Sequence, residues 1–193
     1  PLLAGISGGA DSLCLLFLLS ALKLPVIAAY FDHKLRPESA QEASIIAQFA
    51  AQAGCDFLVG EGDVRLLAKM EGLGIEAAAR KARYTFLFEQ AQRVGAQAVA
   101  VGHTADDQVE TILLHLLRGS GLDGLKGMSY RSFLPGFSQE IPLIRPLLGI
   151  WREETAAFCA ERGLNPLEDR TNQDKRYARN RLRHELIPEL ESY

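Results

Sequence analysis

Short apolar runs alternate with longer amphipathic segments along most of the chain. Four runs read as buried parallel strands, because nearly all their residues are apolar and turn residues bound them: 2–6, 26–31, 56–60 and 96–101. Segments with helical periodicity follow at 10–22, 37–54, 76–94 and from 104 onward, with a weaker short helix inside 62–74. Strand–helix alternation repeated four times predicts a doubly wound, mainly parallel α/β sheet.

The second half of the chain is less regular. Glycine, serine and proline recur from 119 to 142, and we expect a long loop there. An extended segment is predicted at 143–148, an amphipathic helix at 151–162 and a last helix from about 177. In the helix after 104 we expect a buried apolar stripe formed by Val109, Ile112, Leu113, Leu116 and Leu117.

The composition is typical of a globular protein of one domain, with 193 residues of which 48% are apolar. No apolar run has the length of a membrane span, so we expect no membrane association. Cys14, Cys55 and Cys159 are isolated in the sequence, which fits reduced thiols in a cytoplasmic protein. The sequence leaves the oligomeric state open, with a homodimer as one candidate.

The segment Ser7-Gly8-Gly9-Ala10-Asp11-Ser12 joins the first strand to the first helix. A glycine-rich turn that opens a helix can surround an oxyanion with backbone N–H groups, and the two serine hydroxyls add hydrogen bonds. Asp11 would repel a bare phosphate, so the segment predicts pyrophosphate together with Mg²⁺. A helix cap at Ser7 and a tight turn would explain the same residues without a ligand.

Further polar residues follow the second and fourth predicted strands. Asp32 and His33 end one strand and His103 ends the other, so they should meet the glycine-rich turn at the carboxyl edge of the sheet. Asp107 and Glu110 follow His103 at helical spacing and could hold a metal ion or an ammonium group. An acidic first turn favoured by the helix dipole is the alternative explanation for Asp107.

Basic residues are concentrated in two places, although the net charge is −3. Arg80 and Arg83 share one face of a predicted helix and could contact phosphates or simply be solvated. The stretch from 170 to 183 contains six basic residues and one acidic residue, with Tyr177 and Asn180 among them. Such a segment can contact RNA, and it can equally be a solvated helix face.

Five motifs carry a family resemblance: SGGADS (7–12), DHKLRPES (32–39), EAAARKARY (76–84), GHTADDQVETILLHLLRGSGLDGLKGM (102–128) and EDRTNQDKRYARNRLRHELIP (168–188). SGGADS is the signature of PP-loop ATPases. Together the motifs resemble the N-terminal catalytic domain of the tRNA(Ile)-lysidine synthases, across nearly the whole chain. The resemblance implies a Rossmann-like fold of the adenine nucleotide alpha hydrolase type with a C-terminal helical extension.

The resemblance also implies a reaction and a set of residue roles. ATP would adenylate the C2 oxygen of the wobble cytidine in the isoleucine tRNA with a CAU anticodon, and the ε-amine of L-lysine would displace AMP to form lysidine. ATP would be bound by Ser7–Ser12, Asp32, His33 and Arg80, with Mg²⁺ on Asp11, and catalysis would involve Asp11, Arg80 and His103. Lysine would be bound by Asp107 and Glu110, and tRNA by Arg145, Arg176, Arg179, Arg181 and Arg183.

The domain expectation is a catalytic unit spanning 1–193, with an α/β core to about 163. A basic linker and helix from 164 to 193 would lead toward further tRNA-binding domains, because members of this family continue past this point. Three other functions are weighed. A tRNA thiolase would need a catalytic cysteine near the motifs, an amidotransferase would need a glutaminase domain, and a nucleotide sensor would leave Asp107 and Glu110 idle.

Overall fold

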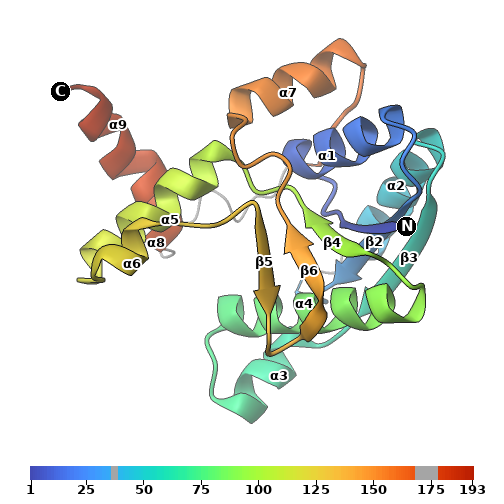
Figure 1. Cartoon of the computed structure of the whole chain (residues 1–193), viewed down its shortest axis with the longest axis horizontal. Helices are drawn as coiled ribbons and strands as arrows, with labels where there is room; N and C mark the ends of the chain where they lie inside the picture. Colours follow the sequence, from blue (N-terminus) through green and yellow to red (C-terminus); the bar gives the residue numbers. More distant parts are fainter. Residues whose placement is uncertain (36–38, 168–177) are drawn as a thin grey trace.

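The computed structural model describes the chain from residue 1 to 193 apart from 36–38 and 168–177 (Figure 1). Its described strands form one sheet in the order β3-β2-β1-β4-β6-β5. They are β1 (Leu2–Gly5), β2 (Val26–Asp32), β3 (Asp56–Glu61), β4 (Ala98–Val101), β5 (Arg131–Leu134) and β6 (Ser138–Ile144). All neighbours are parallel except β5, which runs antiparallel to β6.

The strand order creates a switch point between β1 and β4. The chain moves from β1 outward through β2 to β3 and then returns to β4 on the other side of β1. The segments that leave β1 and β4 therefore diverge at the same edge of the sheet, which is where open α/β sheets bind ligands. The doubly wound sheet expected from the sequence is confirmed.

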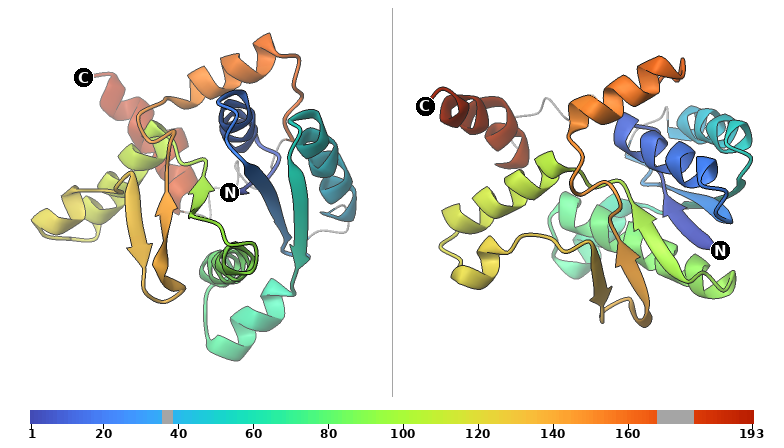
Figure 2. Two further views of the ribbon diagram at one scale, coloured as in Figure 1. Left: turned by 45° about the vertical axis from the view of Figure 1, so that its right-hand side comes forward. Right: turned by 45° about the horizontal axis from the view of Figure 1, so that its top comes forward.

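Helices cover both faces of the sheet (Figures 1 and 2). On one face lie α1 (Ala10–Ala21), α2 (Ser39–Gln52) and α7 (Arg152–Glu161), and on the other α3 (Val64–Glu71) and α4 (Ile75–Arg93). Leu13, Leu16 and Ile46 are buried in the first interface, and Leu87 and Leu143 are buried in the second. The continuous apolar runs of β1 and β4 follow from burial on both faces.

The remaining helices extend from the carboxyl edge of the sheet. They are α5 (Ala105–Leu117), α6 (Leu122–Leu125), α8 (Ala178–Arg181), the π-helical turn η2 (Leu182–Leu186) and α9 (Ile187–Glu191). Both α8 and η2 contact α5, so the predicted C-terminal helical extension packs beside the helix that carries Asp107 and Glu110. No helix among the described residues is both long and apolar enough to cross a bilayer.

Two sequence predictions about local structure are wrong. The segment expected to be a long loop forms α6 and the hairpin of β5 and β6, whose irregular register and scattered glycines hide the strand alternation. The expected apolar stripe of α5 is also displaced. Leu116 and Leu117 are exposed, whereas Glu110, Thr111 and Leu114 are buried, because this helix packs against α8 and η2 rather than against the sheet.

Candidate active site

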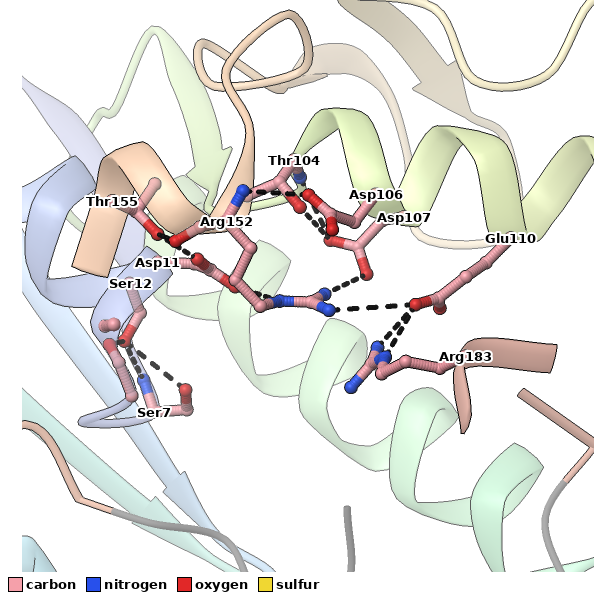
Figure 3. Close-up of polar contacts among 12 residues, drawn as sticks. Ser7, Asp11, Ser12, Thr104, Asp106, Asp107, Glu110, Arg152, Thr155 and Arg183 are labelled. Atoms are coloured by element: carbon pink, nitrogen blue, oxygen red, sulfur yellow. Dashed lines mark hydrogen bonds and ion pairs between the residues drawn. The ribbon is translucent and has the colours of Figure 1, made fainter. Parts of the chain in front are cut away.

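The loop after β1 wraps tightly before α1 begins. Gly8 adopts a left-handed backbone (φ +81°), which favours glycine, and Gly9 is the N-cap residue of α1 without a side-chain cap. The Ser12 hydroxyl accepts from the Ser7 amide at 3.1 Å and donates to the Gly9 carbonyl at 2.9 Å (Figure 3). The first-turn N–H groups of α1, which have no intrahelical partners, thus border a concave turn suited to phosphate oxygens.

The end of β4 approaches this loop closely at Gly102, which has no side chain. A β-carbon at Gly102 would lie 2.9 Å from the carbonyl oxygen of Asp11 and 3.2 Å from Cα of Ser12. Both of those contacts are backbone atoms that cannot rotate away. The close approach brings the segment after β4 directly beside the start of α1, which places His103 and α5 next to the phosphate-binding turn.

Three carboxylates from two helices surround one guanidinium group. Arg152, the first residue of α7, directs Nε to Asp11 at 3.4 Å, Nη2 to Asp107 at 3.3 Å and Nη1 to Glu110 at 3.8 Å (Figure 3). Asp11 also accepts a short hydrogen bond from the buried hydroxyl of Thr155. Burial raises the pKa of Asp11, and the contacts with Thr155 and Arg152 oppose that rise.

Glu110 is almost completely buried, with 1% of its surface exposed. Its Oε1 accepts from Nε and Nη2 of Arg183 at 2.8 and 2.7 Å. Its Oε2 is buried too, and within the described part of the chain it has no hydrogen-bond partner. Burial raises the pKa of Glu110, while the charge of Arg183 opposes the rise. A buried carboxylate oxygen without a partner is an acceptor suited to a ligand donor.

Asp107 has a structural role at the start of α5, and its binding of a ligand stays a prediction. Its Oδ2 accepts from the Thr104 amide at 2.9 Å in a capping box at the start of α5, and its Oδ1 faces Arg152. Asp106, beside it, accepts from the Arg152 amide at 2.8 Å. The acidic first turn therefore caps its own helix and also fixes the beginning of α7.

His103 lies among arginines rather than beside the carboxylates alone. Burial lowers its pKa to about 4; Asp107 opposes this, and the charges of Arg145, Arg83 and Arg80 add to it. His103 is consequently neutral near pH 7 and able to accept a proton or a hydrogen bond. The guanidinium groups of Arg80 and Arg83 lie 4.7 and 5.4 Å from the ring centre of Tyr84.

The other residues proposed for ATP lie at the end of β2. Asp32 is buried and accepts from the Lys34 amide at 2.8 Å. The His33 ring meets the edge of Phe31, with 5.1 Å between ring centres. Arg80 is exposed on α4. The structure thus places Asp32 and His33 on the strand next to the phosphate-binding turn, and their contacts with ATP stay a prediction.

The residues proposed for tRNA occupy different environments. Arg145 is buried and donates to the Ser129 carbonyl at 2.7 Å and to the Ser132 hydroxyl at 3.0 Å, so it joins β6 to the β5 side of the hairpin. Arg183 is engaged by Glu110, Arg179 is half-buried and Arg181 is exposed. Arg176 lies outside the described residues. The tRNA contacts of all five stay a prediction.

Sequence reasoning missed Arg152 and Thr155. Both lie in α7, more than 140 residues after Asp11, in a helix predicted only as amphipathic. A signal was available, because Thr155 is a polar residue on the buried face of α7 and Arg152 stands at its first turn, where the helix dipole disfavours a cation. A cation at such a position indicates acidic partners elsewhere.

The donor set suits a Mg²⁺ ion that arrives with phosphates. The described residues contain no group of three or more His, Cys, Asp or Glu side chains that could hold a metal ion by themselves. Mg²⁺ bound with nucleotides commonly takes only one or two carboxylates and fills its other positions with phosphate oxygens and water. Asp11, at the first turn of α1, is the carboxylate that would serve.

Comparison with known proteins identifies the family. A model described as the PP-loop domain matches residues 1–190. The chain belongs to this PP-loop family. It is 44% identical to a tRNA(Ile)-lysidine synthase of Salinispora arenicola over 98% of this chain, and 36% identical to one of Clostridioides difficile over 95%. The chain spans only 56% and 39% of the length of these relatives.

The PP-loop fold extends to more distant structures. The U34-tRNA thiolase of Methanococcus maripaludis superposes with a TM-score of 0.70 at 17% identity, covering 86% of this chain and 58% of the thiolase. At that identity the likeness concerns the fold alone.

Proposed function

We propose that this PP-loop chain is the ATP-using catalytic part of an enzyme that makes lysidine. In the proposed reaction the C2 oxygen of the wobble cytidine, in the isoleucine tRNA with a CAU anticodon, is adenylated by ATP. The ε-amine of L-lysine then displaces AMP, with pyrophosphate as the other product. The observation that carries this proposal is the junction at Arg152, where Asp11 of the glycine-rich turn meets Asp107 and the buried Glu110 of α5.

The phosphate end of ATP would bind at Ser7–Ser12. The loop offers first-turn N–H groups to the phosphate oxygens, while the Ser7 and Ser12 hydroxyls hold the loop in shape, and such a preorganised set of donors stabilises the charge that develops as pyrophosphate leaves. Mg²⁺ held by Asp11 would neutralise part of the phosphate charge. Arg80 is exposed on α4 and reaches the same edge of the site as His103, where it would contact the phosphates.

The amine would bind beside α5. Asp107 and Glu110 supply negative charge, and the Oε2 of Glu110, which has no hydrogen-bond partner in the described parts of the chain, offers an acceptor to an ammonium group. An ε-ammonium must lose a proton before it attacks, and either a carboxylate of raised pKa or the neutral His103 could take that proton. The buried carboxylate Glu110 suits this role because burial raises its pKa.

The tRNA would approach from the side of the C-terminal helices. The half-buried Arg179 and the exposed Arg181 lie on α8, which packs against α5, so phosphate contacts there would bring RNA near the acidic pair. Arg183 would act on Glu110 rather than on RNA phosphate, because its Nε and Nη2 both contact Oε1 of Glu110.

Pyrophosphate release tests the proposal directly. The full-length gene product would be incubated with ATP and the unmodified CAU-anticodon isoleucine tRNA, with and without radiolabelled L-lysine. We expect pyrophosphate release that requires this tRNA, and label that enters the RNA. Asp11→Ala should abolish the release. ATP binding without tRNA-dependent turnover would overturn the proposal and favour a nucleotide sensor or another PP-loop enzyme.

A further inference from the structure

The guanidinium of Arg152 is held loosely. Its three carboxylate contacts measure 3.3, 3.4 and 3.8 Å, whereas Arg183 reaches Glu110 at 2.7 and 2.8 Å. Strong charge-assisted hydrogen bonds measure about 2.7–2.9 Å, so none of the Arg152 contacts is a strong one. The Arg152 side chain is also 30% exposed, which leaves it a path toward solvent.

The backbone of Arg152 is fixed even though its side chain is not. Its amide donates to Asp106 at 2.8 Å, and its carbonyl accepts from Thr155 at 2.8 Å. Thr155 is fully buried against Asp11. The side chain can therefore swing out of the acidic pair while α7 and Asp11 keep their positions.

Carboxylates outnumber cations around Arg152 in the described part of the chain. Asp11, Asp107 and Glu110 face its guanidinium and Asp106 accepts from its amide, while Arg183 is the other guanidinium that contacts Glu110. Among the described residues, the buried Oε2 of Glu110 has no hydrogen-bond donor. A primary ammonium in place of the Arg152 guanidinium would keep a positive charge there and add a donor for this oxygen.

We infer that Arg152 is a specificity-determining counter-ion that occupies the ammonium position beside Asp107 and Glu110 until the amino substrate displaces it. The identity of that substrate rests on the proposed function. Displacing Arg152 costs part of the binding free energy of every amine. A substrate must therefore make additional contacts through the rest of its structure. A simple alkylamine makes no such contacts and does not displace Arg152.

The test removes the competing cation and measures lysine affinity. Arg152→Gln in the full-length protein should bind L-lysine more tightly, with a dissociation constant and a KM about fivefold lower, the scale expected for a partly exposed ion pair. Arg162→Gln is the matched control, since Arg162 caps the other end of the same helix and stacks on Phe158. This control should leave both constants unchanged.

Two further measurements separate displacement from a purely structural role. Ethylguanidinium should compete with L-lysine in Arg152→Gln and raise its KM toward the wild-type value, while leaving the wild-type KM unchanged. Arg152→Lys, which keeps a cation without the guanidinium fork, should give an intermediate KM. Thermal melting establishes that each variant is folded.

The outcomes distinguish this inference from the proposed function. A higher lysine dissociation constant in folded Arg152→Gln, or an unchanged one, would overturn the displacement of Arg152. Calorimetry of L-lysine binding gives that answer without turnover. A wild-type protein that binds L-lysine but never modifies tRNA would overturn the proposed function and leave the Arg152 comparison standing.

Discussion

Gly8 and Gly9 are adjacent in the phosphate-binding loop, yet an added methyl group should affect them in opposite ways. At Gly8 the backbone is left-handed (φ +81°), and a β-carbon would lie 2.7 Å from Cδ1 of Leu167 and 3.1 Å from Cγ1 of Ile46. At Gly9 the backbone is extended (φ −73°), and the nearest atom to a β-carbon is the Ser7 hydroxyl oxygen at 3.7 Å. The free energy of unfolding should therefore fall much more in Gly8→Ala than in Gly9→Ala.

The magnitudes follow from these environments. A left-handed alanine costs about 1–2 kcal/mol, and the overpacking against Leu167 and Ile46 adds about 1–3 kcal/mol, so Gly8→Ala should lose about 2–5 kcal/mol. Gly54→Ala isolates the backbone cost, because Gly54 has φ +68° and no atom within 4 Å of its β-carbon. Gly9→Ala should lose less than about 1 kcal/mol, the difference between glycine and alanine at an N-cap.

Gly9→Ala should lower the affinity for ATP although it changes stability little. If phosphate oxygens approach the loop backbone, the Gly9→Ala methyl group occupies part of the space they need, and ATP affinity should fall at least about tenfold, equivalent to about 1.4 kcal/mol. Urea unfolding of the three variants gives the free energies of unfolding, and calorimetric titration with Mg²⁺ and ATP gives the affinities. Gly54→Ala should bind ATP like the wild type.

Two results would contradict the predictions for the glycine variants. Wild-type ATP affinity in Gly9→Ala would mean that phosphate does not approach this backbone, and the loop would then be a structural turn. An equal loss of stability in Gly8→Ala and Gly54→Ala would mean that Leu167 and Ile46 adjust without cost, which would refute the packing argument for Gly8.

Two pH-dependent predictions concern the buried titratable groups. Burial raises the folded-state pKa of Glu110 above its ordinary 4.5, so the folded state holds this proton more tightly and the free energy of unfolding should fall as pH rises from about 4.5 through the folded pKa. Glu110→Gln should remove that decline from urea midpoints measured against pH, and an unaltered profile would contradict it. His103 has the opposite sign: its pKa is lowered from 6.5 to about 4, so stability should fall as pH drops below about 6.5, and its imidazole resonances should titrate near pH 4 in NMR spectra. A His103 midpoint near 6.5 would show that the ring is hydrated.

The parts of the site that sequence reasoning placed correctly depend on local signals. The apolar run of β1, the glycines after it and the helical run of α1 are contiguous, so each constrains the next. The acidic first turn of α5 at Asp107 likewise depends on neighbouring residues and was predicted from the helix dipole. The convergence of β1 and β4 followed from topology rules for parallel sheets.

The errors arose where a segment's partner is distant in sequence. Leu116 and Leu117 fit the helical periodicity of the apolar residues but are exposed. The face that α5 buries is determined by its packing against α8 and η2, which lie more than 60 residues later in the chain. Strand β5 and all but the last two residues of β6 were predicted as a loop, because β5 has only four residues and Pro142 interrupts β6. Pairing of β6 with β4 stabilises them as strands.

The sequence by itself determined the α/β fold, the glycine-rich turn and the acidic first turn of α5, because glycine conformation, helix dipoles and hydrophobic periodicity act over a few residues. Only the tertiary structure decided what surrounds those groups. It brought Arg152 and Thr155 to Asp11, buried Glu110 against Arg183 and lowered the pKa of His103. Burial and the Coulomb interactions of a side chain depend on every neighbour that packs around it, wherever that neighbour lies in the chain.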